Sequence, residues 1–113
     1  MIEKTVLDFK ISNTIEEFHI YINAPEQQAM FANMGVKTFY SGVSKDDPGR
    51  ATVMFQGPEN ILYDTFMNPE TKPVVEASGH FYDGTGITRW LAGDDFEVLP
   101  PPRVGFFMQR GIL

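Results

Sequence analysis

Residues 36–57, VKTFYSGVSKDDPGRATVMFQG, hold two strand-like segments joined by a turn. Both segments, residues 36–43 and 50–57, are rich in the β-branched and aromatic side chains that favour strands. The intervening SKDDPG consists of residue types that form turns. We therefore predict an antiparallel β-hairpin at the centre of the fold.

A helical region that restarts at a proline lies on each side of this hairpin. The region before it restarts at Pro25 and ends at Gly35, and the region after it restarts at Pro69 and ends at Gly79. Proline suits the first turn of a helix, and glycine suits its left-handed end. Because the two intervals are equal, we predict the same succession of broken helix, glycine and strand in both halves of the chain.

Two further strands, one before and one after the helical regions, complete the pattern. Residues 3–11 alternate like a strand, and Thr14 with Glu17 then forms a capping box that opens the first helix. A fourth strand is expected within residues 80–91. The order β-α-β-β-α-β predicts an α+β, ferredoxin-like domain over residues 1–91, with a four-stranded antiparallel sheet and helices on one face.

The face of the sheet that points away from the helices is expected to carry large apolar side chains, among them Phe39, Met54 and Trp90. Simple alternation places Tyr40 on the opposite face from Phe39. A monomer would expose such an apolar face to water, which monomeric proteins rarely do. We therefore predict a homodimer of the dimeric α/β-barrel type, in which two sheets pack face to face. The alternative is that the C-terminal tail covers this face.

The tail, residues 92–113, is expected to be a C-terminal extension of the ferredoxin-like domain. It contains a stiff proline spacer at residues 100–102 and an alternating, strand-like segment at residues 104–109. Because burying apolar side chains is favourable, we expect this segment to add a strand to a sheet edge or to cross to a partner subunit. The sequence leaves open whether the extension docks on its own domain or on the partner.

Composition excludes several classes of function. The 113 residues suit one domain and include no cysteine, which rules out disulfides, thiolate metal sites and a cysteine nucleophile. The formal net charge is −6, and lysine and arginine are scattered, so nucleic-acid binding is not expected. No apolar run is long enough to span a membrane, and the N-terminus lacks the features of a signal peptide. A cytoplasmic protein is therefore expected.

Three stretches resemble a known family: TVLDFKISNTIEEF (5–18), YSGVSKDDPGRATVMFQGPENI (40–61) and EASGHFYDGTGI (76–87). They are similar to a family of small uncharacterised proteins found mainly in cyanobacteria, which in turn resembles the dimeric α/β-barrel group of antibiotic-biosynthesis monooxygenase-like proteins. The resemblance covers about residues 3–91 and implies a ferredoxin-like dimer. The wider group includes cofactor-free oxygenases, haem-degrading enzymes, isomerases, decolorising peroxidases and proteins without catalysis, so the resemblance does not select a reaction.

His80 is the candidate catalytic residue. An imidazole titrates near neutral pH, and it can act as a general base or hold a ligand. In a strand His80 shares a face with Tyr82 but not with Asp83, so Asp83 is poorly placed to orient it. The alternative is structural, because His80 follows the helix end at Gly79 and could bond a helix-end carbonyl. No metal site is expected, because the other histidine, His19, lacks a metal-ligand spacing and is expected on a helix surface.

Two loop features are expected to be structural. Asp46 and Asp47 lie in the hairpin turn, where aspartate commonly caps its own backbone. The glycine-rich run at residues 84–86 lies at the start of the fourth strand and not between a strand and a helix. We therefore predict a β-bulge there instead of a phosphate site.

Two functions from different classes remain open. The first is a protein that binds a small apolar or aromatic ligand in a pocket between sheet and helices, with Tyr21, Tyr40, Tyr82 and Trp90 as ligand-binding residues near His80. If this protein is an enzyme, a cofactor-independent oxygenase or isomerase fits, with His80 as base and no cofactor. The second is a non-catalytic dimeric interaction or structural module, in which the same aromatic residues belong to the core and the interface.

Overall fold

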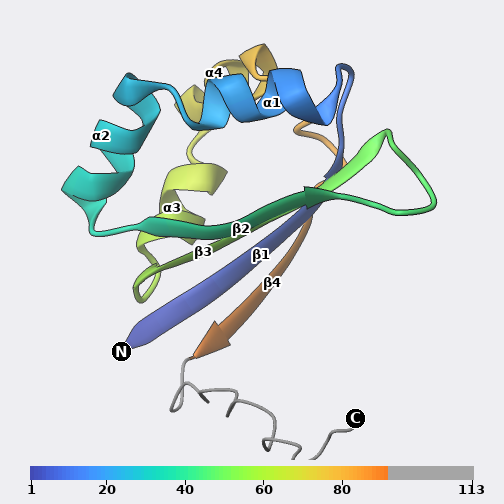
Figure 1. Ribbon diagram of the computed structural model, residues 1–113. Coiled ribbons are helices and arrows are strands. Elements are labelled where there is room, and N and C mark those ends of the chain that lie inside the picture. The colour runs from blue at the N-terminus through green and yellow to red at the C-terminus, as the bar shows by residue number, and fades with distance from the viewer. Residues whose placement is uncertain (92–113) are drawn as a thin grey trace, which may run out of the picture.

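The computed structural model describes residues 1–91, which fold into an antiparallel sheet with helices on one of its faces (Figure 1). In chain order the elements are β1 (Ile2–Lys10), α1 (Ile15–Ile22), α2 (Pro25–Met34), β2 (Lys37–Val43), β3 (Arg50–Pro58), α3 (Ile61–Met67), the 3-10 helix η1 (Pro69–Thr71), α4 (Lys72–Ala77) and β4 (Gly86–Leu91). The strand order across the sheet is β2-β3-β1-β4. The predicted α+β, ferredoxin-like fold is therefore confirmed, whereas the predicted extension and its strand at residues 104–109 lie outside the described residues. No helix within residues 1–91 is long and apolar enough to cross a membrane.

The helices begin and end at the predicted signals. Thr14 Oγ1 accepts a hydrogen bond from the Glu17 backbone N–H at 3.1 Å, and Glu17 Oε1 accepts one from the Thr14 N–H at 3.2 Å, which confirms the capping box. Gly35 ends α2 with φ 72°, and Gly79 follows α4 with φ 93°. Both are left-handed values that favour glycine. Both halves of the chain thus contain the predicted broken helix that ends at a left-handed glycine. The predicted strand follows almost at once in the first half, where β2 begins at Lys37, but in the second half β4 begins only at Gly86.

The core fills the space between the helices and the inner face of the sheet. Alternate side chains of β1 and β3 point into this space, as the alternation predicts, and large apolar side chains from α1, α2 and α3 pack onto them. The buried members of the core are Leu7, Phe9, Ile11, Phe18, Phe31, Val36, Ala51, Val53, Phe55, Leu62 and Phe66. The cavity described below lies within this layer.

A β-bulge in β2 determines the face of the sheet on which Tyr40 lies. Thr38 is in register with the inner face of β3, but the register then shifts, and Tyr40 pairs with Met54 on the outer face. Phe39 lies on this outer face as well, because the Lys4 Nζ is 5.3 Å from the centroid of its ring. The prediction that Tyr40 and Phe39 lie on opposite faces is therefore wrong, since the extra residue of the bulge breaks strict alternation.

The segment between α4 and β4 contains a turn. β4 begins at Gly86, and His80 forms only an isolated bridge with the residue that follows β1. The Thr85 N–H donates to the Tyr82 carbonyl oxygen at 3.3 Å, and Gly84 has φ 85° inside this turn. The predicted β-bulge is therefore wrong, because the glycine-rich run makes the turn that leads the chain into β4.

An ion pair between the buried Glu3 and the exposed Arg89, at the other end of the sheet, holds the start of α3. Glu3 is 4% exposed, its Oε2 accepts a hydrogen bond from Arg89 Nε at 2.5 Å, and its Oε1 accepts one from the Asn60 N–H at 2.6 Å. The Arg89 hydrogen bond lowers the pKa of Glu3, against the opposing effect of burial. Asn60 has a left-handed φ of 72° and directly precedes α3. The pair thereby positions the helix that supplies Leu62 and Phe66 to the core.

Candidate functional site

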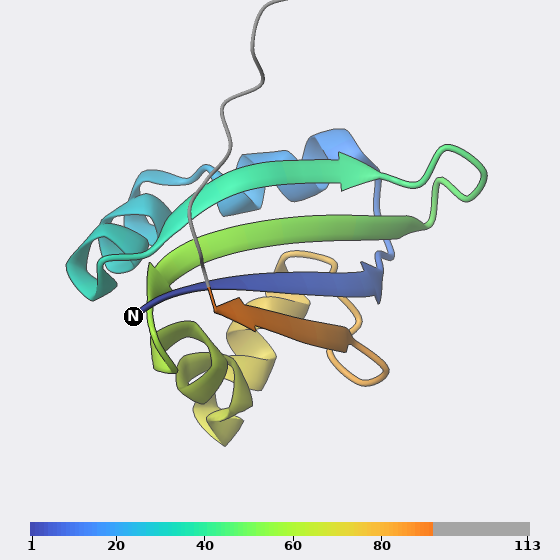
Figure 2. The same ribbon diagram turned by 90° about the horizontal axis from the view of Figure 1, so that it is seen from below.

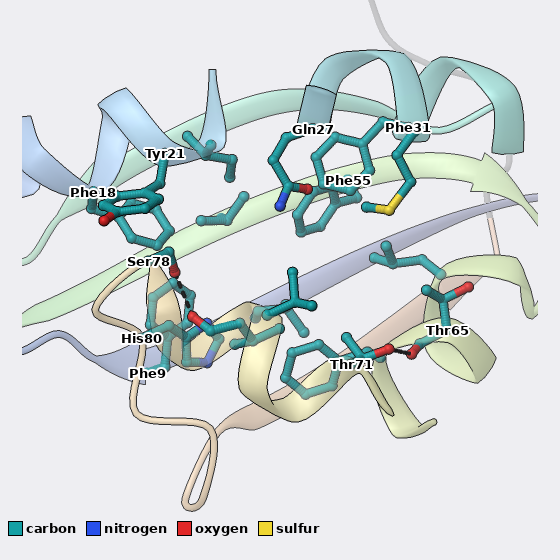
Figure 3. A pocket seen from close by; sticks show the side chains of 18 residues that line it. Phe9, Phe18, Tyr21, Gln27, Phe31, Phe55, Thr65, Thr71, Ser78 and His80 are labelled. Carbon is teal, nitrogen blue, oxygen red and sulfur yellow. Dashed lines mark hydrogen bonds between the residues drawn. The ribbon is translucent and has the colours of Figure 1, made fainter. Parts of the chain in front are cut away.

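An apolar cavity of about 110 Å³ lies between the inner face of the sheet and the helices (Figure 3). Phenylalanine, leucine and valine side chains from β1, β3 and the helices form most of its wall. Tyr21, Met30 and Val74 belong to the wall and are also 49, 39 and 50% exposed, so the cavity opens to solvent between α1, α2 and α4. An engineered apolar cavity of about 150 Å³ binds benzene. The cavity therefore suits a molecule the size of a small ring, which could extend through the open side.

His80 is a buried member of this wall, with 5% of its surface exposed. Its ring stacks on Phe9 with centroids 3.6 Å apart and planes 7° apart, and the Phe66 ring lies 5.7 Å away. Burial lowers the pKa of His80 to about 4, so the imidazole is neutral at pH 7. Its Nε2 lies 2.8 Å from Thr85 Oγ1. The alternative in which the ring bonds a helix-end carbonyl is therefore wrong.

The backbone sets the inward position of His80. Gly79 turns the chain with φ 93°, and the Phe81 N–H donates to the Lys10 carbonyl oxygen at 2.9 Å, which ties the segment to β1. In the first half of the chain Val36 also follows a left-handed glycine and is likewise buried, with 6% exposed. A valine fits the corresponding place in the core, so the fold itself does not require an imidazole at position 80.

Two of the predicted tyrosines lie at or next to the cavity. Tyr21 projects from α1 at its rim (Figure 3). Tyr82 is not part of the wall but stacks on Phe66, with ring centroids 4.7 Å apart, and its hydroxyl donates to the Phe66 carbonyl oxygen. An ion pair of 3.2 Å between Lys72 and Asp83 joins α4 to the same turn. Tyr82 therefore holds α3 against the turn that precedes β4.

Tyr40 and Trp90 lie on the outer face of the sheet, which is turned toward the viewer in Figure 2. Tyr40 reaches this face because of the bulge in β2. Trp90 pairs with the outward-facing Lys4 and donates from Nε1 to Thr88 Oγ1 at 3.1 Å. With Phe39 they are exposed aromatic side chains of this face, in which Tyr40, Trp90 and Phe39 are 49, 60 and 43% exposed. Phe39 and Tyr40 lie on the edge strand β2 and Trp90 lies on the opposite edge strand β4, with β3 and β1 between them. The sheet separates Tyr40 and Trp90 from the cavity, so neither belongs to the pocket predicted for them.

Gln27 is a polar cavity residue that no sequence pattern marked. Its side chain points from the first turn of α2 into the cavity (Figure 3), and its amide makes no hydrogen bond to other residues within 1–91. Glutamine is an ordinary helix residue, so only the helix restart at Pro25 could have indicated its place. The amide can both donate and accept a hydrogen bond, and it is thus a second polar group for a ligand.

The other candidate residues have structural partners. His19 Nε2 lies 2.8 Å from Ser41 Oγ and joins α1 to β2 outside the cavity wall, so His19 is half-buried and not on the open helix surface. Asp47 Oδ1 accepts a hydrogen bond from the Gly49 N–H at 3.0 Å, which confirms the predicted turn cap. In the part of the chain that the structure describes, no group of three histidine, aspartate or glutamate side chains could hold a metal ion.

Solved structures with this fold include proteins described as oxygenases. SnoaB, a cofactor-independent oxygenase from Streptomyces nogalater, has a TM-score of 0.57 and 13% identity over 83% of this chain and 95% of that chain. A protein from Deinococcus radiodurans described as a candidate antibiotic biosynthesis monooxygenase has a TM-score of 0.57 and 10% identity over 88% and 100% of the two chains. A dimeric ferredoxin-like protein from an uncultured marine organism has a TM-score of 0.54 and 9% identity over 87% and 93%. At these identities the likeness shows the fold alone.

The comparisons confirm the predicted resemblance to the antibiotic-biosynthesis monooxygenase-like group at the level of the fold. They do not bear on a cyanobacterial source, which stays a prediction. No curated protein matches the sequence. A family described as "Domain of unknown function (DUF3764)" matches residues 2–92, which include the whole ferredoxin-like domain. The chain therefore belongs to this family, DUF3764.

Proposed function

We propose that this protein binds a small apolar or aromatic molecule in the cavity between sheet and helices, with His80 as the polar group that orients it. The observation that carries the proposal is a buried, neutral imidazole in a wall made mostly of apolar side chains. Ligand pockets are mostly apolar and contain a few polar groups that fix the orientation of the ligand. Tyr21 at the rim and Gln27 on α2 add two such groups.

The pKa of His80 favours binding over catalysis as the main role. A cofactor-independent oxygenase or isomerase would need a base that takes a proton from its substrate, and such a base works best with a pKa near the operating pH. Burial holds the pKa of His80 at about 4, so the free protein offers a weak base. A reaction of this class therefore requires a substrate that raises the pKa of His80 when it binds.

Thermal unfolding with small aromatic probes tests the binding proposal. Toluene or indole at ten times its Kd should stabilise the folded state by about 1.4 kcal/mol and raise Tm by about 5 to 10 °C. Val75→Phe places a larger side chain in the cavity wall and should abolish this shift, whereas Val6→Phe on the outer face should retain it. No shift in the wild-type protein, or an equal shift in Val75→Phe, would refute binding in this cavity.

The outer face favours a second proposal, in which the protein forms a homodimer through this face of the sheet, which carries Phe39, Tyr40 and Trp90, with the cytoplasm as its compartment. Large exposed apolar side chains on one face commonly mark interfaces, and one protein of the same fold is described as dimeric. Light scattering should give the mass of two chains for the wild type and of one chain for Trp90→Glu. Ile20→Glu changes a residue on the helix side that is even more exposed than Trp90 and should leave the dimer intact. A monomeric wild type would rule the dimer out.

The two proposals separate the two functional classes. A protein that dimerises through the outer face but takes up no probe in the cavity would be a non-catalytic interaction module. The cavity lies on the inner face of the sheet, and the exposed aromatic side chains lie on its outer face. Val75→Phe therefore tests binding in the cavity, and Trp90→Glu tests the dimer, without either variant changing the other site.

A further inference from the structure

Thr85 links the ring of His80 to the backbone of the turn before β4. Thr85 Oγ1 lies 2.8 Å from His80 Nε2, 2.7 Å from the Tyr82 carbonyl oxygen and 3.4 Å from the Phe81 carbonyl oxygen. A hydroxyl has one proton to donate, and a carbonyl oxygen can only accept. The proton therefore goes to the nearer carbonyl, that of Tyr82. The hydroxyl oxygen is left to accept the proton on Nε2 of His80.

This arrangement leaves a lone pair on Nδ1 of His80. A neutral imidazole carries one N–H, which here is on Nε2. Nδ1 makes no hydrogen bond within residues 1–91. The buried side-chain atoms without a partner in that part of the chain are Asn13 Oδ1 and Thr38 Oγ1, so Nδ1 is not sealed in the core. It therefore reaches open space, and we infer that this space is the cavity, because His80 belongs to the cavity wall.

No other described group competes with Thr85 for the ring. The two aromatic neighbours of His80, Phe9 and Phe66, flank it with apolar rings that offer no donor or acceptor in the plane of the imidazole. The hydroxyl of Thr85 is thus the one group within residues 1–91 that distinguishes the two nitrogens of His80. Which nitrogen carries the proton is set by the hydrogen bond that the ring makes.

We propose that Thr85 is a positioning residue that fixes Nδ1 of His80 as a hydrogen-bond acceptor, and that the cavity thereby selects small apolar ligands carrying a hydroxyl or N–H donor. A ligand of the same shape with only an acceptor would set its lone pair against that of Nδ1. The preference for donors rests on the proposed binding function. The tautomer does not, because it is a property of the free protein.

The tautomer is tested on the free protein by imidazole ¹⁵N NMR at pH 7. The wild type should show the proton of His80 on Nε2 and a bare Nδ1, with His19→Gln used to assign the two sets of histidine signals. Thr85→Val keeps the shape but removes the hydroxyl and should populate the other tautomer, whereas Thr85→Ser should keep the wild-type pattern. If Thr85→Val does not fold, Thr85→Ala replaces it. A wild-type proton on Nδ1, or an unchanged pattern without the hydroxyl, would overturn the proposal.

The selectivity is tested with indole and indene, which differ by an N–H in place of a CH₂ group, because the indole N–H can only donate a hydrogen bond. The cost of removing this N–H from water affects the ratio of their Kd values, but it cancels when the ratio is compared between variants. The preference for indole should fall by about tenfold in His80→Phe and in Thr85→Val and should persist in Thr85→Ser. Equal ratios in all four proteins would refute the selectivity. If neither probe binds the wild type, the binding function fails as well, whereas the NMR result still decides the tautomer.

Discussion

Lowering the pH should destabilise this protein through His80, and His80→Phe isolates the effect. Burial lowers the pKa of His80 in the folded state from 6.5 to about 4. Between these two values the unfolded chain binds a proton that the folded chain does not, so protons favour unfolding. The stability carried by the neutral ring is therefore complete above pH 6.5 and is lost as the pH falls toward 4.

The size of the effect follows from the two pKa values. Relative to neutral pH, the free energy of unfolding should fall by about 1 kcal/mol at pH 5.5 and by about 2 to 3 kcal/mol at pH 4.5. Because the side chain is only 5% exposed, solvent screens this contribution little. The limiting loss of about 3 kcal/mol is large beside the roughly 5–15 kcal/mol that stabilises a typical domain.

Urea unfolding at about pH 7.5, 5.5 and 4.5 measures these losses. Carboxylates titrate in the same range, so the quantity to follow is the unfolding free energy of the wild type minus that of His80→Phe, in which their contributions cancel. This difference should fall by the two amounts given above, and His80→Val should give the same pH dependence with a different constant offset. A difference that stays constant from pH 7.5 to 4.5 would refute the reasoning, because the folded protein would then take up the proton as readily as the unfolded chain.

Three further changes test the surroundings of the site. Glu3→Gln should lower the free energy of unfolding by about 1–3 kcal/mol at pH 7, because hydrogen bonds to a charged group are lost. The difference between the two proteins should disappear at a pH low enough to protonate Glu3 in the wild type. Equal stability of the two proteins in urea at pH 7 would contradict this. Gly79→Ala should lower the free energy of unfolding by more than Gly84→Ala does, because both glycines have positive φ but, of the two, only at Gly79 would a Cβ clash with another side chain, that of Asn13. Calorimetry that ranks the two variants the other way would count against this packing. Deleting residues 96–113 should lower Tm or change the mass in solution if the tail docks, and an unchanged Tm and mass would show that it does not.

The fold could be predicted from the alternation of apolar residues in the strands and from the spacing of the glycines, because both patterns reflect backbone geometry that repeats along the chain. Alternation along residues 3–11 and 50–57 assigned the inward faces of β1 and β3 correctly, and the glycine intervals located both helix ends. Tyr40 was assigned to the wrong face, since a bulge depends on how two strands pair and not on the residues of one strand. The same is true of Gly84, whose turn depends on where β4 pairs with β1.

The candidate site was predictable only in part. His80 stood out because a titratable side chain occupies a place whose counterpart is Val36, and this contrast is visible in the sequence. Its hydrogen-bond partner Thr85 lies across a turn, and Gln27 comes from a helix on the other side of the cavity. Neither belongs to a periodic pattern, so only the folded chain brings Thr85 to His80 and Gln27 to the cavity. Trp90 alternates onto the outer face of β4, which by itself excludes it from a pocket on the inner face.

The free nitrogen of His80 links stability to binding. A polar atom that is cut off from water without a hydrogen-bond partner costs about 1–3 kcal/mol, and a valine such as Val36 fills the corresponding place without a polar ring atom. Because Nδ1 reaches a cavity that opens to solvent, a hydrocarbon ligand that displaces water leaves this atom unsatisfied, whereas a ligand that donates a hydrogen bond pairs it. The same atom therefore disfavours hydrocarbon ligands and favours donor ligands. It follows that a donor ligand should stabilise the wild type more, relative to His80→Phe, than an isosteric hydrocarbon does.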